Sequence, residues 1–417
     1  MFRADLHIHS RFSRATSSRL TIPHLAAWAG VKGIDVLATG DFTHPVWRQE
    51  LRDALAPDEK SGLLRLKHPL TRSDIAREIP HLAGMEPREP LFMLETEISS
   101  IYKKNGAVRK IHSLVYVPDF ESADRLCEKL EAVGNLKSDG RPILGLDVKD
   151  LLSMVLDIPR AYMIPAHIWT PWFALFGSKS GFDRLEDCFD DLSSHIFALE
   201  TGLSSDPGMN RMVSQLDGYA LISNSDAHSG ANLGREANFF AGAPSYDGIF
   251  AALRAAARRL PPDRQPQDCR FLGTMEFYPE EGKYHLDGHR NCNVCLTPPE
   301  TQARDGLCPV CGKKLTIGVE HRVEELADEL AEARKTIVGL EAIPENNGVH
   351  FARLYKAYKS YVGENHIGAL CSRCWPDFFT EFGTPVCSVL SLLNANGVSA
   401  SCESDAYGAL SMFIGSD

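Results

Sequence analysis

The chain has 417 residues, about two to three times the roughly 150 residues of a typical domain, so more than one domain is expected. Hydrophobic residues make up 44% and charged residues 24%, which excludes disordered, collagen-like and coiled-coil proteins. The net charge of −11 disfavours a protein that coats nucleic acid nonspecifically. Because the sequence contains neither a long apolar run nor a leader-like start, we expect a cytoplasmic protein with no membrane partner.

Short apolar runs alternate with amphipathic stretches from residue 1 to about residue 260. The runs predict strands at Phe2–His7, Ile34–Thr39, Leu91–Ile98, Ile111–Val117, Tyr162–Ala166, Ile196–Leu199 and Ala220–Ser223. The amphipathic stretches predict helices at Thr21–Val31, Ser122–Val133 and Tyr246–Arg258. This alternation predicts an α/β fold with a mostly parallel sheet or closed barrel, in which functional residues follow the carboxyl ends of the strands.

The composition changes several times after residue 260. Residues 261–268 are rich in proline and polar residues, which is typical of a linker. A module with paired cysteines follows, then a charged run that favours a helix, and finally a stretch of small, apolar and cysteine residues. We therefore expect three domains, with the bounds 1–260, 269–332 and 345–417.

Side chains that can bind metal ions follow several of the predicted strands. In the motif DLHIHS, Asp5, His7 and His9 alternate, so in a strand they point to one face. Further candidates stand at the other strand ends: Asp41, His44, Glu97, His112, His167, Asp226 and His228. Imidazole and carboxylate groups bind divalent ions such as Zn, Mn or Fe. Their repetition at strand ends predicts a centre of two or three ions.

These motifs resemble those of the PHP superfamily of metal-dependent phosphoesterases. The resemblance implies a distorted (β/α)7 barrel with a cluster of Zn, Mn, Mg or Fe ions at its mouth. It implies eight ligands: His7, His9, Asp41, Glu97, His112, His167, Asp226 and His228. Glu97 is then expected to bridge two ions.

The chain departs from the superfamily pattern at two places. It reads RFSRATS where members often carry a further His or Asp, which leaves the third ion open. It also reads TGDFTH in place of T-D-H, so that Asp41 takes the position of the family histidine. His44 is then an extra ligand or an acid–base group, and the expected catalytic residues are His44, Asp41 and Glu97.

Longer motifs such as AHIWTPWFALFGSKSGF and ETGLSSDP resemble the endonuclease Q branch, over roughly residues 1–330. This resemblance implies a DNA repair enzyme that uses metal-activated water to cut 5′ to uracil, hypoxanthine, xanthine or an abasic site. Its expected partners are DNA with deaminated bases and replication or repair proteins. The oligomeric state stays open.

An aromatic and polar loop follows His167. Three aromatic residues could stack on an extruded base: Trp169, Trp172 and Phe173. Three polar residues could hold a phosphate: Ser178, Lys179 and Ser180. Alternatively, the aromatic residues pack in the core or in a lid.

Two C-x2-C pairs have the spacing of a zinc ribbon: Cys292, Cys295, Cys308 and Cys311. Four thiolates in this pattern predict one structural zinc ion, which would fold a module too small to be stable alone. Nearby polar residues are candidate contacts to a DNA backbone, or simply a solvated face: Lys283, His285, His289 and Arg290.

Residues 345–417 resemble a fragment of the L-fucose/L-arabinose isomerase family, and we expect a small α/β segment there. Glu403 and Asp405 match acidic metal-site positions of that family, but the remaining ligands are missing. Isomerase activity is therefore not expected. Cys371 and Cys374, followed by Trp375 and Pro376, match the isomerase motif better than a zinc or redox pair.

Two alternative functions remain at this point. One is a PHP-type phosphatase that acts on a small phosphomonoester, which would need neither a zinc ribbon nor a Trp-rich loop. The other is a catalytically inactive zinc-ribbon protein that binds DNA, against which the acidic net charge weighs.

Overall fold

The computed structural model describes residues 1–258, 266–327, 345–373, 386–402 and 405–415, together with residues 260, 264 and 378. The chain divides into two compact units. The first contains Met1–Pro207 and Gln215–Arg322, and the second contains Gly208–Ser214 and Val323–Asp417. Parts of the predicted linker and of the charged run lie outside the described residues, as do Cys374, Trp375, Pro376 and Glu403.

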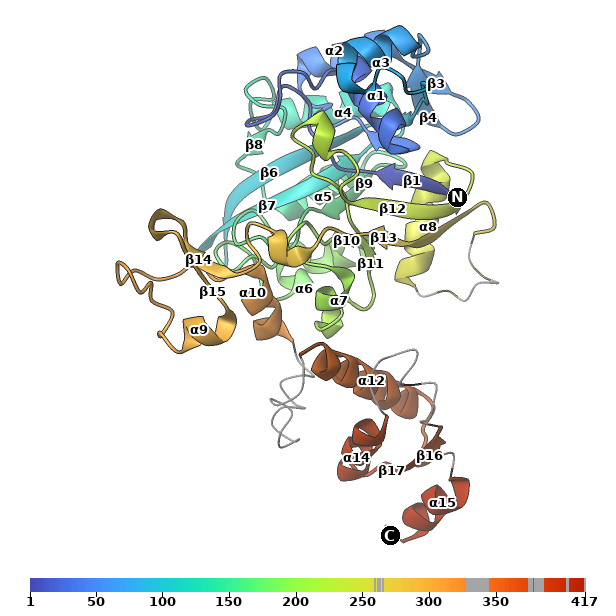
Figure 1. The fold of residues 1–417 in the computed structure, drawn as a ribbon, viewed down its shortest axis with the longest axis vertical. Helices are drawn as coiled ribbons and strands as arrows, with labels where there is room; N and C mark the ends of the chain where they lie inside the picture. Colours follow the sequence, from blue (N-terminus) through green and yellow to red (C-terminus); the bar gives the residue numbers. More distant parts are fainter. Residues whose placement is uncertain are drawn as a thin grey trace. The chain divides into compact units, whose positions relative to one another are not determined.

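The first unit is built on a sheet of seven strands in the order β13-β12-β1-β2-β5-β4-β3. Its strands are β1 (Phe2–Asp5), β2 (Val36–Ala38), β3 (Leu55–Asp58), β4 (Leu63–Leu66), β5 (Leu91–Met93), β12 (Ala237–Gly242) and β13 (Cys269–Met275). Strands β1, β12 and β13 lie side by side in Figure 1. The central strands β1, β2 and β5 pair in parallel, whereas the flanking pairs are antiparallel. The sheet is therefore mixed.

A second sheet has the order β8-β6-β7-β9. Its strands are β6 (Glu95–Lys104), β7 (Ala107–Tyr116), β8 (Ile143–Leu144) and β9 (Tyr162–Pro165). Strands β6 and β7 form a long antiparallel hairpin around Asn105 and Gly106, whose φ angles are 53° and 74°. Asn-Gly is the preferred pair for a two-residue turn with positive φ at both positions. The prediction of a mostly parallel sheet was wrong, because this hairpin and the flanking pairs of the seven-stranded sheet are antiparallel.

Two short strands, β10 (Ala198–Glu200) and β11 (Ala220–Ile222), pair in parallel. The described strands of the first unit thus fall into separate sheets, and a closed (β/α)7 barrel stays a prediction. The expected α/β class is confirmed. The predicted strand Leu91–Ile98 is instead divided between β5 and β6, which lie in different sheets, and β6 continues to Lys104.

The helices of the first unit are α1 (Ile22–Lys32), α2 (Pro45–Ala54), α3 (Arg72–Glu78), α4 (Phe120–Glu131), α5 (Val148–Leu156), α6 (Leu185–Phe189) and α8 (Tyr246–Ala257). The short helix α7 (Pro207–Asn210) begins at its boundary and continues into the second unit. The three predicted helices are confirmed as α1, α4 and α8. Side-chain caps fix two of their starts, since Asp119 accepts from Ser122 N and Ser245 accepts from Gly248 N. The aromatic face of α8 packs into the main core through Phe250.

The cysteine module belongs to the first unit and contains β14 (Asp287–His289), β15 (Val294–Leu296) and α9 (Pro298–Gln302), followed by α10 (Val319–Leu326). The second unit contains α12 (Glu345–Glu364), β16 (Ala369–Ser372), α14 (Cys387–Ala395), β17 (Ser399–Cys402) and α15 (Ala406–Ile414). Strands β16 and β17 are parallel, and the unit has its own core around Tyr355, Val389 and Leu393. Across the described residues, every helix is too short or too polar to cross a bilayer.

Candidate metal centre

The ends of β1 and β11 bring His7, His9 and Asp226 together. An isolated parallel bridge between Ile8 and Ala227 joins the segments that follow these two strands, with His9 N donating to Ala227 O at 3.1 Å. Asp226 N also donates to His7 O at 3.0 Å. The alternation predicted from DLHIHS therefore places both imidazoles beside the Asp226 carboxylate.

These three residues form the first ligand group. His9 Nε2 lies 3.0 Å and His7 Nε2 lies 3.7 Å from Asp226 Oδ1. The three atoms are buried and have no well-directed hydrogen bond. Buried polar atoms are nearly always satisfied, so three unsatisfied ligand atoms facing one another fit a cation.

Glu97, His112 and His167 form the second ligand group. Glu97 lies in β6 and His112 in β7, and His167 follows β9. Glu97 Oε1 is 2.6 Å from His112 Nδ1 and 3.0 Å from His167 Nε2. Both groups offer imidazole nitrogen and carboxylate oxygen, a donor set that fits Zn or Mn.

Glu97 also connects the two groups. Its second oxygen, Oε2, lies 3.4 Å from His9 Nε2 and 3.9 Å from His7 Nε2. One carboxylate therefore faces both sets of imidazoles with different oxygen atoms. This geometry suits the expected bridging role, which stays a prediction.

Buried carboxylates and imidazoles determine the charge of the centre. Burial lowers the pKa of His9, but Asp226 and Asp41 outweigh it and raise the pKa to about 10. Burial favours the neutral form of Glu97, but His112 and Arg141 hold its pKa well below the usual range. The centre thus attracts positive charge, and cations that bind there must displace protons from imidazoles.

Asp41 and His228 lie beside the ligand groups. Asp41 Oδ1 accepts from His9 Nδ1 at 3.1 Å, and its Oδ2 accepts from Ser10 N at 2.7 Å. A side chain at Gly140 would meet Asp41 Oδ2 at 2.3 Å, so this carboxylate is tightly enclosed. The ring of His228 lies 4.7 Å from that of His9.

His44, the expected acid–base residue, has a structural position. It is the N-cap of α2, where its Nδ1 accepts from Trp47 N at 3.4 Å, and its ring stacks on Phe12. Burial lowers the pKa of His44. Its ring therefore takes no part in either ligand group.

Three ionisable residues were missed by the sequence analysis. Glu200 Oε1 accepts from His7 Nδ1 at 3.0 Å, and Arg141 Nη1 donates to Glu97 Oε2 at 2.9 Å. Glu95 is fully buried with both oxygens unsatisfied, and burial raises its pKa well above the usual value. Glu95 had a signal, because it precedes Glu97 by two residues on the same strand face.

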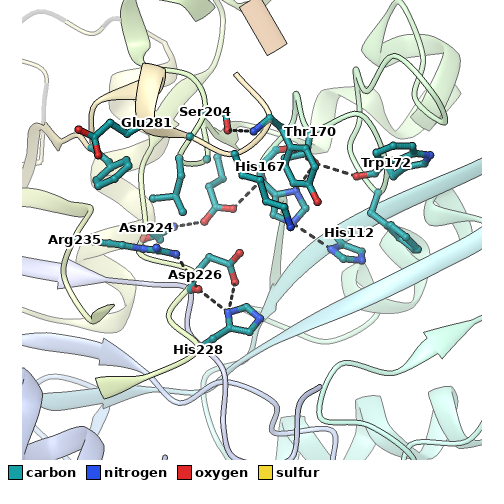
Figure 2. A pocket seen from close by; sticks show the side chains of 18 of the residues that line it. His112, His167, Thr170, Trp172, Ser204, Asn224, Asp226, His228, Arg235 and Glu281 are labelled. Carbon is teal, nitrogen blue, oxygen red and sulfur yellow. Dashed lines mark hydrogen bonds and ion pairs between the residues drawn. The ribbon is translucent and has the colours of Figure 1, made fainter. Parts of the chain in front are cut away.

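The ligand groups border a cleft of about 710 Å³. Figure 2 shows His112, His167, Asp226 and His228 around its base, with Trp172 at one side. Three cationic residues also line it: Arg141, Arg235 and Lys283. Three carboxylates line the same cleft: Glu200, Asp226 and Glu281. The cationic side chains can contact an anion such as a phosphate there, and bound cations would offset the carboxylates.

Two of the three predicted aromatic substrate residues line this cleft, and the third is buried. Trp172 and Phe173 line the cleft, and Trp172 is 41% exposed. Trp169 is 1% exposed and packs on Phe176, so its ring is not accessible to a base in this conformation.

The polar loop lies outside the residues that line the cleft. Ser178 Oγ donates to Ile317 O, Lys179 Nζ donates to Leu315 O, and Ser180 Oγ donates to Lys110 O. Two of these contacts join the loop to the part of the cysteine module between Cys311 and α10.

The cysteine module brings together His289, Cys292, Cys308 and Cys311. Their ligand atoms lie within 4.8 Å of one another. Cys295, which was expected as the fourth ligand, contributes no atom to this group and is exposed in β15.

Known proteins are similar in sequence to different parts of the chain. No protein-family model matches the chain. The chain is 29% identical over 338 residues to the uncharacterized protein YqxK of Bacillus subtilis, covering 78% of this chain and 77% of YqxK. It is 59% identical over 97 residues to the sulfoquinovose isomerase of a Clostridium species. That match spans 22% of the isomerase and supports a partial C-terminal segment.

Two solved structures resemble the chain over most of its length. One is the lesion-specific endonuclease PfuEndoQ from Pyrococcus furiosus, with a TM-score of 0.61, 25% identity, and coverage of 99% of this chain and 90% of that chain. The other is Endonuclease Q in complex with a 27-mer duplex that has an abasic lesion at the active site, with a TM-score of 0.63, 25% identity, and coverage of 88% and 92%. The mixed α/β structure is therefore similar to that of Endonuclease Q.

Proposed function

We propose that this chain is a metal-dependent DNA endonuclease that hydrolyses the phosphodiester 5′ to a deaminated base or an abasic site. The observation that carries the proposal is the pair of ligand groups joined by Glu97 beside a cleft that Arg141 and Arg235 also line. The similarity to an endonuclease captured with damaged duplex DNA supports the choice of substrate.

Different residues of the chain would bind the cations, the phosphate and the extruded base. Divalent cations, when bound, supply charge that activates water and stabilises the leaving oxygen of a phosphodiester. His7, His9 and Asp226 would hold one cation, and Glu97, His112 and His167 would hold the other. Arg141 and Arg235 would attract and orient the phosphate, and Trp172 would stack on a base that has left the duplex.

The test uses end-labelled duplexes that contain a single deoxyuridine, deoxyinosine or abasic site, with an undamaged duplex as reference. The full chain is incubated with Mn²⁺ or Mg²⁺, and the cut is mapped on a sequencing gel. We expect one cut on the 5′ side of the lesion and no cut in the reference duplex. His7→Ala and Asp226→Ala should abolish it, whereas the exposed His68→Ala should not.

Two results would contradict the proposal. Hydrolysis of a small phosphomonoester without nicking of any damaged duplex would favour a phosphatase. DNA binding that is unchanged in His7→Ala and Asp226→Ala, with no nicking by the parent chain, would favour a binding protein without catalysis.

A further inference from the structure

The cysteine module contains two turns with the same backbone plan. In the second turn, Cys308 N donates to Lys313 O, and Gly312, four residues after Cys308, has a φ of 69°. In the first turn, His289 pairs with Val294, and Asn293, four residues after His289, has a φ of 51°. Gly and Asn are the residues that most readily adopt this left-handed conformation.

This equivalence aligns the two turns as His289-x2-Cys292-Asn and Cys308-x2-Cys311-Gly. His289 therefore occupies the position of Cys308, and Cys292 occupies the position of Cys311. The side chains agree with this alignment, because Cys311 Sγ lies 3.6 Å from His289 Nδ1. The ligand atoms of Cys292 and Cys308 lie within 4.8 Å of each other and of these two atoms.

Cys295 falls after the turn in the same alignment, at the position of Lys314. It lies in β15, opposite Gly288 of β14, and its side chain is exposed. Successive side chains of a strand point to opposite faces, so a residue beyond the turn cannot replace His289 without a change of register.

We propose that the structural zinc site of this chain is His289, Cys292, Cys308 and Cys311, and that Cys295 is a free surface thiol. Three thiolates and one imidazole are an established ligand set for structural zinc. The site then carries one negative charge less than a four-thiolate site. This inference does not depend on the proposed endonuclease activity.

The first test compares two exposed cysteines of the same module in the zinc-loaded full chain. N-ethylmaleimide is added under native conditions, and the labelled cysteines are identified by peptide mass spectrometry. Cys295 should be labelled and Cys311 protected until a chelator removes the zinc. The exposed Cys371 and Cys387 report that the reagent is active. Protection of Cys295 together with Cys311 would overturn the proposal.

The second test uses Co²⁺ in place of zinc, because thiolate-to-cobalt charge-transfer bands arise from cysteine ligands and not from the His and carboxylate centre. Cys295→Ser should leave these bands unchanged, and His289→Ala should reduce or remove them. His289→Cys should restore a tetrahedral site with stronger charge transfer. Loss of the bands in Cys295→Ser, with retention in His289→Ala, would show a four-cysteine site instead.

Discussion

Two buried carboxylates fix the orientation of the histidines in the first ligand group. Glu200 accepts from His7 Nδ1 and Asp41 accepts from His9 Nδ1, so each ring presents Nε2 to the space between them. Such partners set the tautomer of a ligating histidine and increase its basicity. In this structure Asp41 positions His9, which differs from the catalytic role expected for it.

Glu200→Gln tests the positioning role. The substitution keeps the size of the side chain but removes the charge that holds the His7 Nδ1 proton. Loss of such a partner typically weakens metal binding about 10- to 100-fold. Titration of the metal-free chain with Mn²⁺, followed by calorimetry, measures the change. The exposed Glu59→Gln serves as the control, and equal affinities of the two variants would contradict the role.

A second pair of carboxylates, Glu236 and Glu276, lies outside the ligand groups. Burial, followed by the charge of Glu276, raises the pKa of Glu236 to about 9, and Oε2 of each residue is unsatisfied. Between pH 4.5 and about 9, the folded chain therefore retains a proton that the unfolded chain has released. This difference lowers the stability as the pH rises through that window.

Glu236→Gln should remove this pH dependence. Each pKa unit corresponds to about 1.4 kcal/mol, so the variant should gain several kcal/mol relative to the parent near pH 9. Near pH 4 the two chains should have similar stability, because Glu236 is protonated in both states of the parent. Melting temperatures measured across this range check the expectation. A gain of equal size at every pH would argue for a packing effect instead.

At the scale of elements, local signals predicted α1, α4 and α8 and most of the strands of the first unit. The capping residues Asp119 and Ser245 stand at the starts of two of these helices, so their signal is local. The order of the strands was not accessible in this way, because β1 pairs with β12 more than two hundred residues later in the chain. The Asn105-Gly106 turn was a local signal that was overlooked.

That turn positions the strands that carry Glu97 and His112. Gly106→Ala places a side chain at a φ of 74°, which costs about 1–2 kcal/mol in a residue other than glycine. Urea unfolding should show the chain destabilised by about this amount. Gly145→Ala, where the backbone is not left-handed and no atom lies within 4 Å of the added carbon, should change little. Equal effects of the two variants would contradict the assigned turn.

For the whole molecule, the sequence identified the ligand groups better than their surroundings. His7, His9 and Asp226 belong to short sequence motifs, and in the structure they form one ligand group. Glu200 and Arg141 contact the same centre from segments that have no metal-binding motif. Their roles depend on contacts between distant parts of the chain and could not be predicted from local sequence. For the zinc site, the cysteine spacing concealed the contribution of His289.

All residues of the ligand groups, the cleft and the cysteine module lie in the first unit, whereas the segment similar to the isomerase lies in the C-terminal part. A chain that ends at residue 327 should therefore cut a lesion-containing duplex at the same position and with a similar rate as the full chain. Its metal content and melting transition show whether it is folded. The full chain should not isomerise a sugar, because the isomerase match spans 22% of that enzyme. A folded, metal-loaded truncated chain that fails to cut would show that the second unit takes part in catalysis or in DNA binding.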